Sequence, residues 1–443
     1  MTHMSDERPE SLKSYLGADP GDADRSRCSI ACEDSMNWMY IVCHSYYDAM
    51  RSCRLIGGVE TYVNSLISLA KQRGYSAVIL QQGPEHPDIR LEDGTTIKYW
   101  QSLDEVATEL RDLQEVAPGI IVYSDFPCTP ARVEHPSVII QHGVGWDYRG
   151  PTRQNPIVEQ LYKTTLPVRH YLLHHRIRRL AQAVDRVICV DTNFVNFLRT
   201  RFVSDDWDGR LVYVPNFAPS LSPEAALGRW RRRPQRLRCI CPRRFTRIRG
   251  AVLFARVVSE IADRYPEVDF AFLGRGEEES EIRLLVAGRR NVEVKAVPHE
   301  EMLEEYRRSH LVVIPTIAAE GTSLSCIEAM AAGCAVVATT VGGLGNIVLP
   351  DFNGEMCAPT RAGVREAVSG LLSDYGRMRR YAENGYAVAT QAFSNERWQA
   401  RVWAQIQDVV TKHLSEARAK TQDPRSRLSP ALKPGPRTHD NPL

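Results

Sequence analysis

The chain has 443 residues, of which 43% are hydrophobic and 25% are charged, and its formal net charge is +2. This length exceeds one typical hydrophobic core, so we expect two domains, and the near-balanced charge argues against a nucleic-acid-binding protein held by overall charge. No uninterrupted apolar run is long enough to span a bilayer, and the first ten residues lack the apolar core of a secretion signal.

The first half of the chain predicts a parallel α/β sheet. Residues 1–36 are polar and predict a disordered segment. The apolar runs at residues 38–43 and 76–80 predict buried strands, with an amphipathic helix between them. Similar apolar runs follow at residues 119–123, 137–140, 187–190 and 211–214. Because such strands alternate with helices, residues 37–217 predict a doubly wound domain.

The second half predicts another domain of the same kind. Residues 218–235 contain proline, glycine and charge, and predict a linker. Residues 236–390 carry further buried runs, among them 311–314 and 335–338, and predict a second doubly wound sheet. The tail at residues 415–443 has almost no large apolar side chain, so we expect it to be disordered.

Two carboxylates, Glu320 and Glu328, stand eight positions apart around a turn of small residues. With Thr322 or Ser323 as N-cap, a helix is expected to run to about Ala332. Eight helical positions span roughly 12 Å, which is similar to the reach of a nucleotide-diphosphate-sugar from its sugar to its ribose. The free N–H groups between the acids suit a phosphate, since a helix N-terminus attracts anions. The alternative is an ordinary helix with an acidic first turn.

Residues 320–338 resemble the E-x7-E signature of retaining glycosyltransferases with the GT-B fold, in glycosyltransferase family 4. Residues 241–250 resemble the family's Arg-x4-Lys-Gly segment, and residues 270–276 resemble its strand-then-glycine element. The similarity covers about residues 37–410. It implies an α/β protein with two Rossmann-like doubly wound domains, an acceptor domain and a nucleotide-sugar domain, with a cleft between them. It also implies that closing helices at residues 391–414 cross back to the first domain.

The resemblance assigns the donor-binding residues of the second domain. Glu320 is expected to contact sugar hydroxyls and Glu328 the ribose, with Gly321, Thr322, Ser323 and Leu324 binding the donor between them. Guanidinium groups at Arg244 and Arg249 are expected to hold the diphosphate and to stabilise the charge that develops as it leaves.

Ten arginines and no acid stand between residues 229 and 249, so some of them are expected only to solvate a surface. We prefer Arg244 and Arg249 to Arg243 and Arg247, because only the first pair has the family's spacing before Gly250. At Arg249 the family usually has lysine.

The first domain supplies weaker matches to the same family. Gly57 and Gly58 resemble its glycine turn, which lets backbone N–H groups approach a phosphate. His142 ends an apolar strand at the edge where such sheets bind ligands, and the resemblance places it near the transferred sugar. Asp191 and Asn346 stand where relatives often have serine and an acid. The alternatives are an ordinary turn for the glycines, a packed side chain for His142 and a helix cap for Asn346.

The function implied by the resemblance is a retaining, metal-independent glycosyltransferase without a cofactor, in the cytoplasm. Its partners would be a nucleotide-sugar donor and a hydroxyl acceptor on a glycan, glycolipid or small glycoside, and not nucleic acid. A non-catalytic nucleotide-sugar binder and a sugar-nucleotide epimerase of the same fold remain alternatives. The strings Asp22–Asp24 and Asp206–Asp208 would suggest a metal-dependent GT-A enzyme, but neither follows a convincing strand.

Two further features of the sequence bear on where the protein works. Residues 149–180 carry seven basic residues and one acid, which predicts either a patch for anionic lipid or a lipid-linked acceptor, or a solvated face of the first domain. The eleven cysteines are scattered and odd in number, which favours buried free thiols over zinc ligands or disulfides.

Overall fold

The computed structural model describes residues 36–55, 57–145 and 156–422. Predictions for residues 1–35 and 423–443, including the Asp22–Asp24 string, concern residues outside this part of the chain. The same holds for residues 149–155 of the basic segment.

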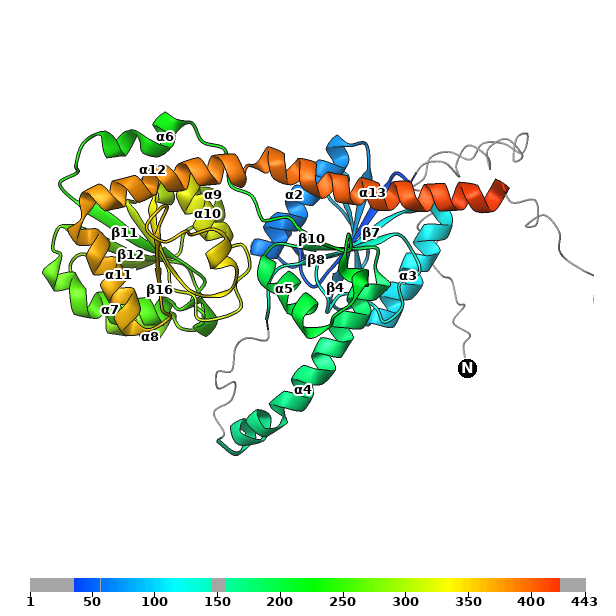
Figure 1. The fold of residues 1–443 in the computed structure, drawn as a ribbon, viewed down its shortest axis with the longest axis horizontal. Coiled ribbons are helices and arrows are strands. Elements are labelled where there is room, and N and C mark those ends of the chain that lie inside the picture. The colour runs from blue at the N-terminus through cyan, green and yellow to red at the C-terminus, as the bar shows by residue number, and fades with distance from the viewer. Residues whose placement is uncertain (1–35, 56, 146–155, 423–443) are drawn as a thin grey trace, which may run out of the picture. The chain divides into compact units, whose positions relative to one another are not determined.

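The first half folds around an eight-stranded sheet with the order β10-β9-β8-β7-β1-β4-β6-β5. Figure 1 labels β4, β7, β8 and β10 of this sheet. All strand pairs are parallel except β5 with β6. The expected strands are present, and β5 and β6 were not predicted. The strands are β1 (Trp38–Cys43), β4 (Ser76–Gln82), β5 (Ile89–Arg90), β6 (Thr96–Trp100), β7 (Gly119–Tyr123), β8 (Ser137–Gln141), β9 (Arg186–Cys189) and β10 (Leu211–Tyr213). A separate hairpin pairs β2 (Tyr47–Asp48) with β3 (Cys53–Arg54).

The helices of the first half begin and end at residues suited to those positions. Helix α2 (Gly58–Gln72) buries Tyr62, Leu66 and Ala70 on one face, and Gly74 follows it with φ +82°. Asp191 is the N-cap of α5 (Thr192–Arg201), where its carboxylate accepts from the N–H of Asn193 at 2.8 Å. The other helices are α3 (Leu103–Val116), α4 (Pro156–Ala183) and the 3-10 turn η1 (Asp205–Trp207).

The second half contains a six-stranded, all-parallel sheet with the order β13-β12-β11-β14-β15-β16. Its strands are β11 (Leu237–Pro242), β12 (Val268–Leu273), β13 (Val292–Lys295), β14 (Leu311–Ile314), β15 (Ala335–Thr339) and β16 (Glu355–Cys357). Its helices are α7 (Ala251–Ile261), α8 (Glu279–Leu285), α9 (His299–Arg307), α10 (Leu324–Ala331), α11 (Arg361–Ser373) and α12 (Tyr375–Ala392). Short 3-10 turns are η3 (Arg247–Arg249), η4 (Ala262–Arg264) and η5 (Gly342–Asn346).

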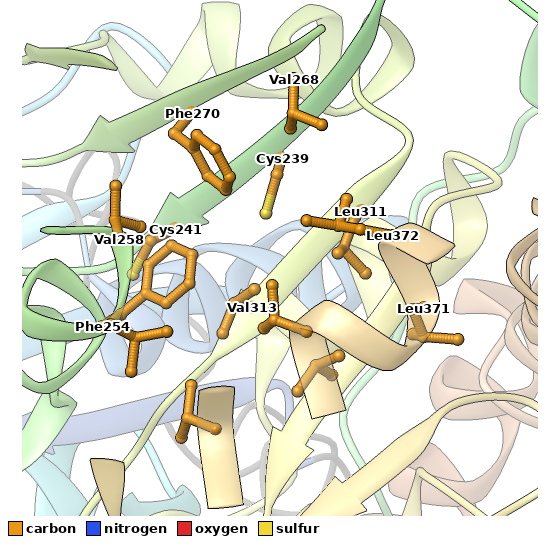
Figure 2. Close-up of a cluster of buried hydrophobic side chains, with 14 of the residues drawn as sticks. Cys239, Cys241, Phe254, Val258, Val268, Phe270, Leu311, Val313, Leu371 and Leu372 are labelled. Carbon is orange, nitrogen blue, oxygen red and sulfur yellow. The ribbon is translucent and has the colours of Figure 1, made fainter. Parts of the chain in front are cut away.

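Both faces of the second sheet are covered, which explains why its strands are apolar at almost every position. Figure 2 shows one face, where Phe254 of α7 and Leu372 of α11 surround Cys239, Phe270 and Val313. The neighbouring strand residues point to the other face and pack in a second cluster with α10. The two clusters hold the carboxyl ends of the strands in a fixed order.

The segment expected to be a linker is folded for much of its length, so that prediction is wrong in its detail. It contains α6 (Pro223–Leu227) and the 3-10 turn η2 (Gly228–Arg231). Trp230 is 1% exposed and its indole N–H donates to the Gly333 carbonyl at 2.8 Å. Arg229 donates to the Ala332 carbonyl at 2.9 Å, where a cation stabilises the carboxyl end of α10. Composition suggested a loop, but Trp230 anchors the segment to the second domain.

The last helix, α13 (Asn395–Gln422), returns to the first sheet. Its Gln405 accepts from Arg186 at 2.8 Å, and His413 lies 2.9 Å from Asp185. The chain crosses between the two sheets twice at one place, where the Ala218 N–H donates to the Phe393 carbonyl at 2.8 Å. The helix continues to Gln422, so the prediction that disorder begins at residue 415 is wrong for residues 415–422. That stretch contains alanine, arginine, glutamate, lysine and glutamine, which favour a helix without a buried face.

Two further expectations can be compared with the described residues. Eight of the nine cysteines in this part of the chain are buried and all nine are free, as expected for thiols kept reduced. Among the helices described, none combines the length and apolar character needed to cross a membrane.

Candidate functional site

A cleft of about 910 Å³ lies at the carboxyl ends of strands from both sheets. The structure brings every residue of the predicted site to its wall, which is lined by Gly57, Gly58, His142, Arg244, Arg249, Glu320, Gly321, Thr322, Ser323, Leu324 and Glu328. The position of these residues therefore permits the roles expected of them. Arg243, Arg275, Asn216 and Tyr306, which were not predicted, also line the cleft.

Glu320 is held by three donors on a single oxygen. The side chain is 7% exposed, and its Oε2 accepts from Thr316 at 2.8 Å, from Arg249 at 2.6 Å and from Arg243. Burial acts to raise the pKa of Glu320, but Arg243, Arg249 and Thr316 together outweigh it and hold the pKa below its ordinary value. Glu320 is therefore a fixed, ionised carboxylate.

Arg243 is the residue that sequence reasoning rejected and the structure places at the centre of the site. It is 7% exposed, and besides Glu320 it donates to Thr316 at 2.9 Å and to Ser323 at 3.3 Å. The match in spacing favoured Arg244 and Arg249 over it. The overlooked signal is that Arg243 is the first residue after β11, at the edge where parallel sheets bind ligands.

Arg244 and Arg249 reach the cleft in different ways. Arg244 is exposed, and its guanidinium lies beside Gly57, where an added Cβ would be 3.1 Å from it. Arg249 is partly buried and also donates to the Ala319 carbonyl at 3.3 Å. The chain turns directly after Arg249 at Gly250, whose φ of +72° and close approach to the Pro315 carbonyl leave no room for a side chain.

The turn between the two glutamates is fixed by its neighbours. Ser323, one of the two residues expected there, is the N-cap residue of α10, and Gly333 follows the helix with φ +72°. A Cβ on Gly321 would collide with the His142 carbonyl, so the two loops cross as bare backbone. Thr322 is bonded on both sides, because its hydroxyl donates to the Val190 carbonyl and its own carbonyl accepts from Asn216 at 2.6 Å. The N-terminus of α10 therefore lies fixed in the cleft wall.

Glu328 occupies a different environment at the other end of the segment. Its Oε2 accepts from the Tyr306 hydroxyl at 3.3 Å. Burial raises the pKa of Glu328, although His299 and Tyr306 act in the opposite direction. Val297, Pro298 and Met302 line the cleft nearby, an apolar surface suited to one face of a base.

His142 follows β8 and is held by ring packing. Its imidazole meets the Tyr62 ring edge-on, with centroids 5.1 Å apart and planes at 85°. Its Nε2 is buried, and no group in the described part of the chain hydrogen-bonds to it. Burial lowers the pKa of His142 to about 4, so the ring is neutral at physiological pH. A neutral imidazole suits a hydrogen bond to a hydroxyl better than the delivery of a proton.

The glycine turn of the first half is closed by Glu60. Gly57 is the N-cap residue of α2, and a Cβ there would collide with the Glu60 carboxylate, which folds back over the turn. Ser45 donates to Glu60 at 2.8 Å and holds it in this position. Glu60 lines the cleft as well.

Asp191 and Asn346 have structural partners. Asp191 caps α5, as described above. The Asn346 side chain accepts from the Thr192 N–H at 3.1 Å and donates to the Thr192 hydroxyl at 2.8 Å, so it secures the first residue of α5. Asp206 accepts from Ser204 at 2.9 Å, and Asp208 accepts from Arg199 at 2.8 Å. These contacts explain both acids of the second Asp-x-Asp string as turn residues.

A group of potential metal ligands lies apart from these residues. Side-chain atoms of His44, Asp125 and Cys128 are within 4.8 Å of one another, at the carboxyl ends of β1 and β7. The Asp125 carboxylate accepts from the Cys128 N–H at 3.1 Å and lies 3.7 Å from the His44 imidazole. These three residues do not line the cleft as described.

Comparison with known proteins gives matches to the second half of the chain and to the whole fold. Residues 236–374 match the family model described as "Glycosyl transferases group 1". D-inositol 3-phosphate glycosyltransferase 2 from Catenulispora acidiphila is 32% identical over 127 residues, which are 28% of this chain and 28% of that protein. The chain thus spans less than a third of the length of this curated relative.

Solved structures resemble a much larger part of the chain. Sucrose-phosphate synthase from Thermosynechococcus elongatus has a TM-score of 0.64 at 16% identity, over 85% of this chain and all of that one. HepE from Anabaena in complex with UDP-glucose has a TM-score of 0.61 at 15% identity, over 85% of this chain and 99% of that one. These likenesses confirm the GT-B fold expected from the sequence.

Proposed function

We propose that this chain, whose residues 236–374 form a glycosyl transferases group 1 domain within a GT-B fold, transfers a sugar from a nucleotide-diphosphate-sugar to a hydroxyl acceptor. The observation that carries the proposal is the single cleft in which Glu320 and Glu328 flank the N-terminus of α10, with Arg243, Arg244 and Arg249 beside it. This arrangement supplies hydrogen-bond acceptors for a sugar and a ribose, and positive charge for the diphosphate between them.

The donor is proposed to lie along the segment from Glu320 to Glu328. Its sugar hydroxyls meet the Glu320 end, and its ribose hydroxyls meet Glu328, which has only one weak hydroxyl contact of its own. Arg244 is the best placed of the three arginines to change partner, since it is exposed and stands beside Gly57 at the start of α2. Backbone N–H groups of α2 and α10 add partial positive charge.

The transfer is proposed to proceed with retention at the anomeric carbon. The bond from that carbon to the diphosphate oxygen breaks, the bond to the acceptor oxygen forms on the same face, and the acceptor proton passes to the departing diphosphate. Glu320 is poorly suited to attack the sugar, because its Oε2 is already bound by Arg243, Arg249 and Thr316. Guanidinium groups and helix N-termini can stabilise the leaving diphosphate, so no metal ion and no cofactor are proposed to be required.

The proposal is tested with three probes, UDP-glucose, GDP-mannose and ADP-glucose. UDP-glucose is included because HepE was solved with it. We expect one probe to raise the melting temperature and to release nucleoside diphosphate slowly with water as acceptor. Arg244→Gln should abolish most of this release, whereas Arg247→Gln, outside the cleft, should not. A melting shift without release would indicate the non-catalytic binder, and release accompanied by an altered free sugar would indicate the epimerase.

The acceptor is proposed to be presented at a membrane surface, with the protein in the cytoplasm. Helix α4 extends beyond the first sheet, as Figure 1 shows, and exposes Val168, Tyr171 and Leu172 beside Arg176 and Arg179. Apolar side chains with neighbouring cations suit the surface of an anionic bilayer.

Liposome co-sedimentation tests this part of the proposal. Vesicles of phosphatidylserine and phosphatidylcholine, whose anionic lipid gives the surface a negative potential, should retain the protein at low salt and release it at high salt. Leu172→Ser should weaken retention, whereas Leu284→Ser, at an exposed leucine of the second half, should not. Equal binding of both variants, or no binding at low salt, would favour a solvated α4.

A further inference from the structure

Helix α13 meets both ends of α2 through two pairs of aromatic rings with the same geometry. Trp398 lies edge-on to Tyr62, with centroids 5.1 Å apart and planes at 86°. Trp403 lies edge-on to Tyr75, just beyond α2, with centroids 5.1 Å apart and planes at 84°. Both indoles are nearly buried, and neither N–H has a hydrogen-bond partner in the described part of the chain. The two pairs therefore share their ring geometry, although the Arg73 guanidinium also lies over the Trp403 ring, 5.8 Å from its centroid.

Of these two pairs, only Trp398 with Tyr62 contacts a residue that lines the cleft. Tyr62 is 1% exposed, and beyond it lies His142, whose ring meets Tyr62 at 5.1 Å and 85°. The backbone on either side of His142 is held separately, since the Gln141 side chain bonds to the Gly143 carbonyl and Gly143 passes against Gly321. The orientation of the His142 imidazole is thus left to ring packing with Tyr62.

Trp398 also contacts the place where the chain crosses between the two sheets. Trp398 also packs on Phe217, with centroids 4.4 Å apart. Phe217 stands between Asn216, which donates to the Thr322 carbonyl, and Ala218, which donates to the Phe393 carbonyl. Trp398 therefore contacts both the crossing and the helix that begins at Gly57 and Gly58.

We propose that Trp398, acting through Tyr62, is a positioning residue that sets the plane of the His142 ring in the cleft. Neither Trp398 nor Tyr62 is proposed to touch the substrates. The effect on turnover rests on the proposed glycosyl transfer, but the effect on the His142 ring does not. The packing of α13 against α2 is therefore required for the correct orientation of His142 beside the transferred sugar.

The experiment compares Trp398→Leu with its matched control Trp403→Leu, with Tyr62→Leu as a second disruption and Tyr62→Phe as the conservative change. The first readout is the NMR titration of the His142 ring in protein labelled with ¹³C-histidine, assigned by its loss in His142→Gln. We expect the pKa of His142 to rise toward its ordinary value in Trp398→Leu and Tyr62→Leu, because water reaches the ring. It should stay unchanged in Trp403→Leu and Tyr62→Phe.

The second readout is nucleoside diphosphate release from whichever of the three probes is turned over. We expect kcat to fall roughly ten- to a hundredfold in Trp398→Leu and Tyr62→Leu, since small misplacements of a positioned group have effects of this size. The KM for the donor should change much less, and Trp403→Leu should lose a similar amount of melting temperature with kcat retained.

Two results would overturn the inference. One is an unchanged His142 titration in both Trp398→Leu and Tyr62→Leu, and the other is the same change in Trp403→Leu as in Trp398→Leu. If Trp398→Leu does not fold, Tyr62→Leu against Tyr62→Phe decides the question. If no probe is turned over, the proposed function fails, while the ring titration still tests the positioning.

Discussion

Glu320 and Glu328 are the same residue type on one short segment, yet their surroundings are opposite in character. Glu320 has three donors on one oxygen, two of them guanidinium groups. Glu328 has one hydroxyl contact at 3.3 Å. The pKa is lowered for Glu320 and raised for Glu328. Glu320 is buried and Glu328 is partly buried, so the lower pKa of the more buried acid comes from its partners.

This difference suggests a division of labour within the cleft. A carboxylate held between two arginines is a rigid part of the wall, and it holds Arg243 in place. A carboxylate with unused acceptor capacity is ready for ribose hydroxyls. Spacing in the sequence reveals that two acids are present, and only their neighbours reveal that Oε2 of Glu320 is already bound by the protein while Glu328 keeps most of its acceptor capacity.

The largest expected effect is the loss of Glu320. Glu320→Ala leaves the buried Arg243 without its carboxylate, and breaking such a pair costs about 3–5 kcal/mol of unfolding free energy. Replacing both partners, as Arg243→Met with Glu320→Met, should restore much of that loss. Urea denaturation measures it, with Glu328→Ala as control. Equal losses in Glu320→Ala and Glu328→Ala would remove the contrast between the two acids.

Mild acid should destabilise the protein through His310, which is buried, and His142, whose Nε2 is buried, at a higher pH than the one at which Glu320 is protonated. Burial lowers the pKa of His142 and His310 to about 4, so the unfolded chain takes up protons below pH 6.5 while the folded protein does not. Stability is complete above that pH and falls as pH decreases, by about 2 kcal/mol per histidine between pH 6.5 and 5. Because the pKa of Glu320 is lowered, the stability that this carboxylate contributes is lost only when the pH falls below the ordinary pKa of a glutamate.

Calorimetry or urea denaturation at several pH values separates these contributions. His310 accepts from the Arg238 N–H at 3.1 Å, a contact that glutamine can replace. His310→Gln should therefore remove about 2 kcal/mol of the pH dependence between pH 6.5 and 5. An unchanged slope in this variant would attribute the acid sensitivity to other groups.

We expect the arginines, like the glutamates, to differ in role, with Arg243 stabilising the fold and Arg244 binding the nucleotide. Arg244 is exposed and has no part in the Glu320 network, so Arg244→Gln should weaken binding of UDP or the preferred nucleotide about tenfold, with little change in stability. Isothermal titration calorimetry gives the affinity and thermal unfolding the stability. A loss of stability without a loss of affinity would give Arg244 the structural role assigned to Arg243.

The smallest effect is expected from Glu328→Gln, and its sign is opposite to that of Glu320. Because the pKa of Glu328 is raised, its stabilising share is present at low pH and is lost as pH rises through the raised value. At neutral pH the charge on Glu328 destabilises the folded protein. Glu328→Gln should therefore stabilise the protein by about 1 kcal/mol, while nucleotide affinity falls. Destabilisation at pH 7 would mean that Glu328 has partners as strong as those of Glu320.

The sequence predicted those elements whose signals are local. Strands β14 and β15 are uninterrupted apolar runs, and α10 lies between small turn residues and Gly333. Strand β6 was missed because it alternates and carries Lys98, which pairs with Asp88 and Glu109 and thus tolerates its partly buried position.

The sequence predicted which residues lie at the candidate site, but it did not predict the hydrogen bonds and ring contacts between them. That Glu320, Arg249 and His142 would meet followed from the resemblance to a family with a two-domain cleft. That Arg243 would take the buried place depends on where a side chain points after β11, which motif spacing does not specify. The aromatic contacts of His142 join α2, β8 and α13, elements hundreds of residues apart at the extremes, and no local pattern records them.

The return of α13 to the first sheet has a consequence for how the protein is made. Residues 37–217 leave the ribosome without the 28-residue helix that covers Tyr62 and Tyr75. The second domain is continuous in the sequence, so it can complete its fold during synthesis. The first domain cannot complete its own fold until α13 has been made. We therefore expect a nascent chain stalled before α13 to expose these rings, and early termination there to yield a protein prone to chaperone capture and aggregation.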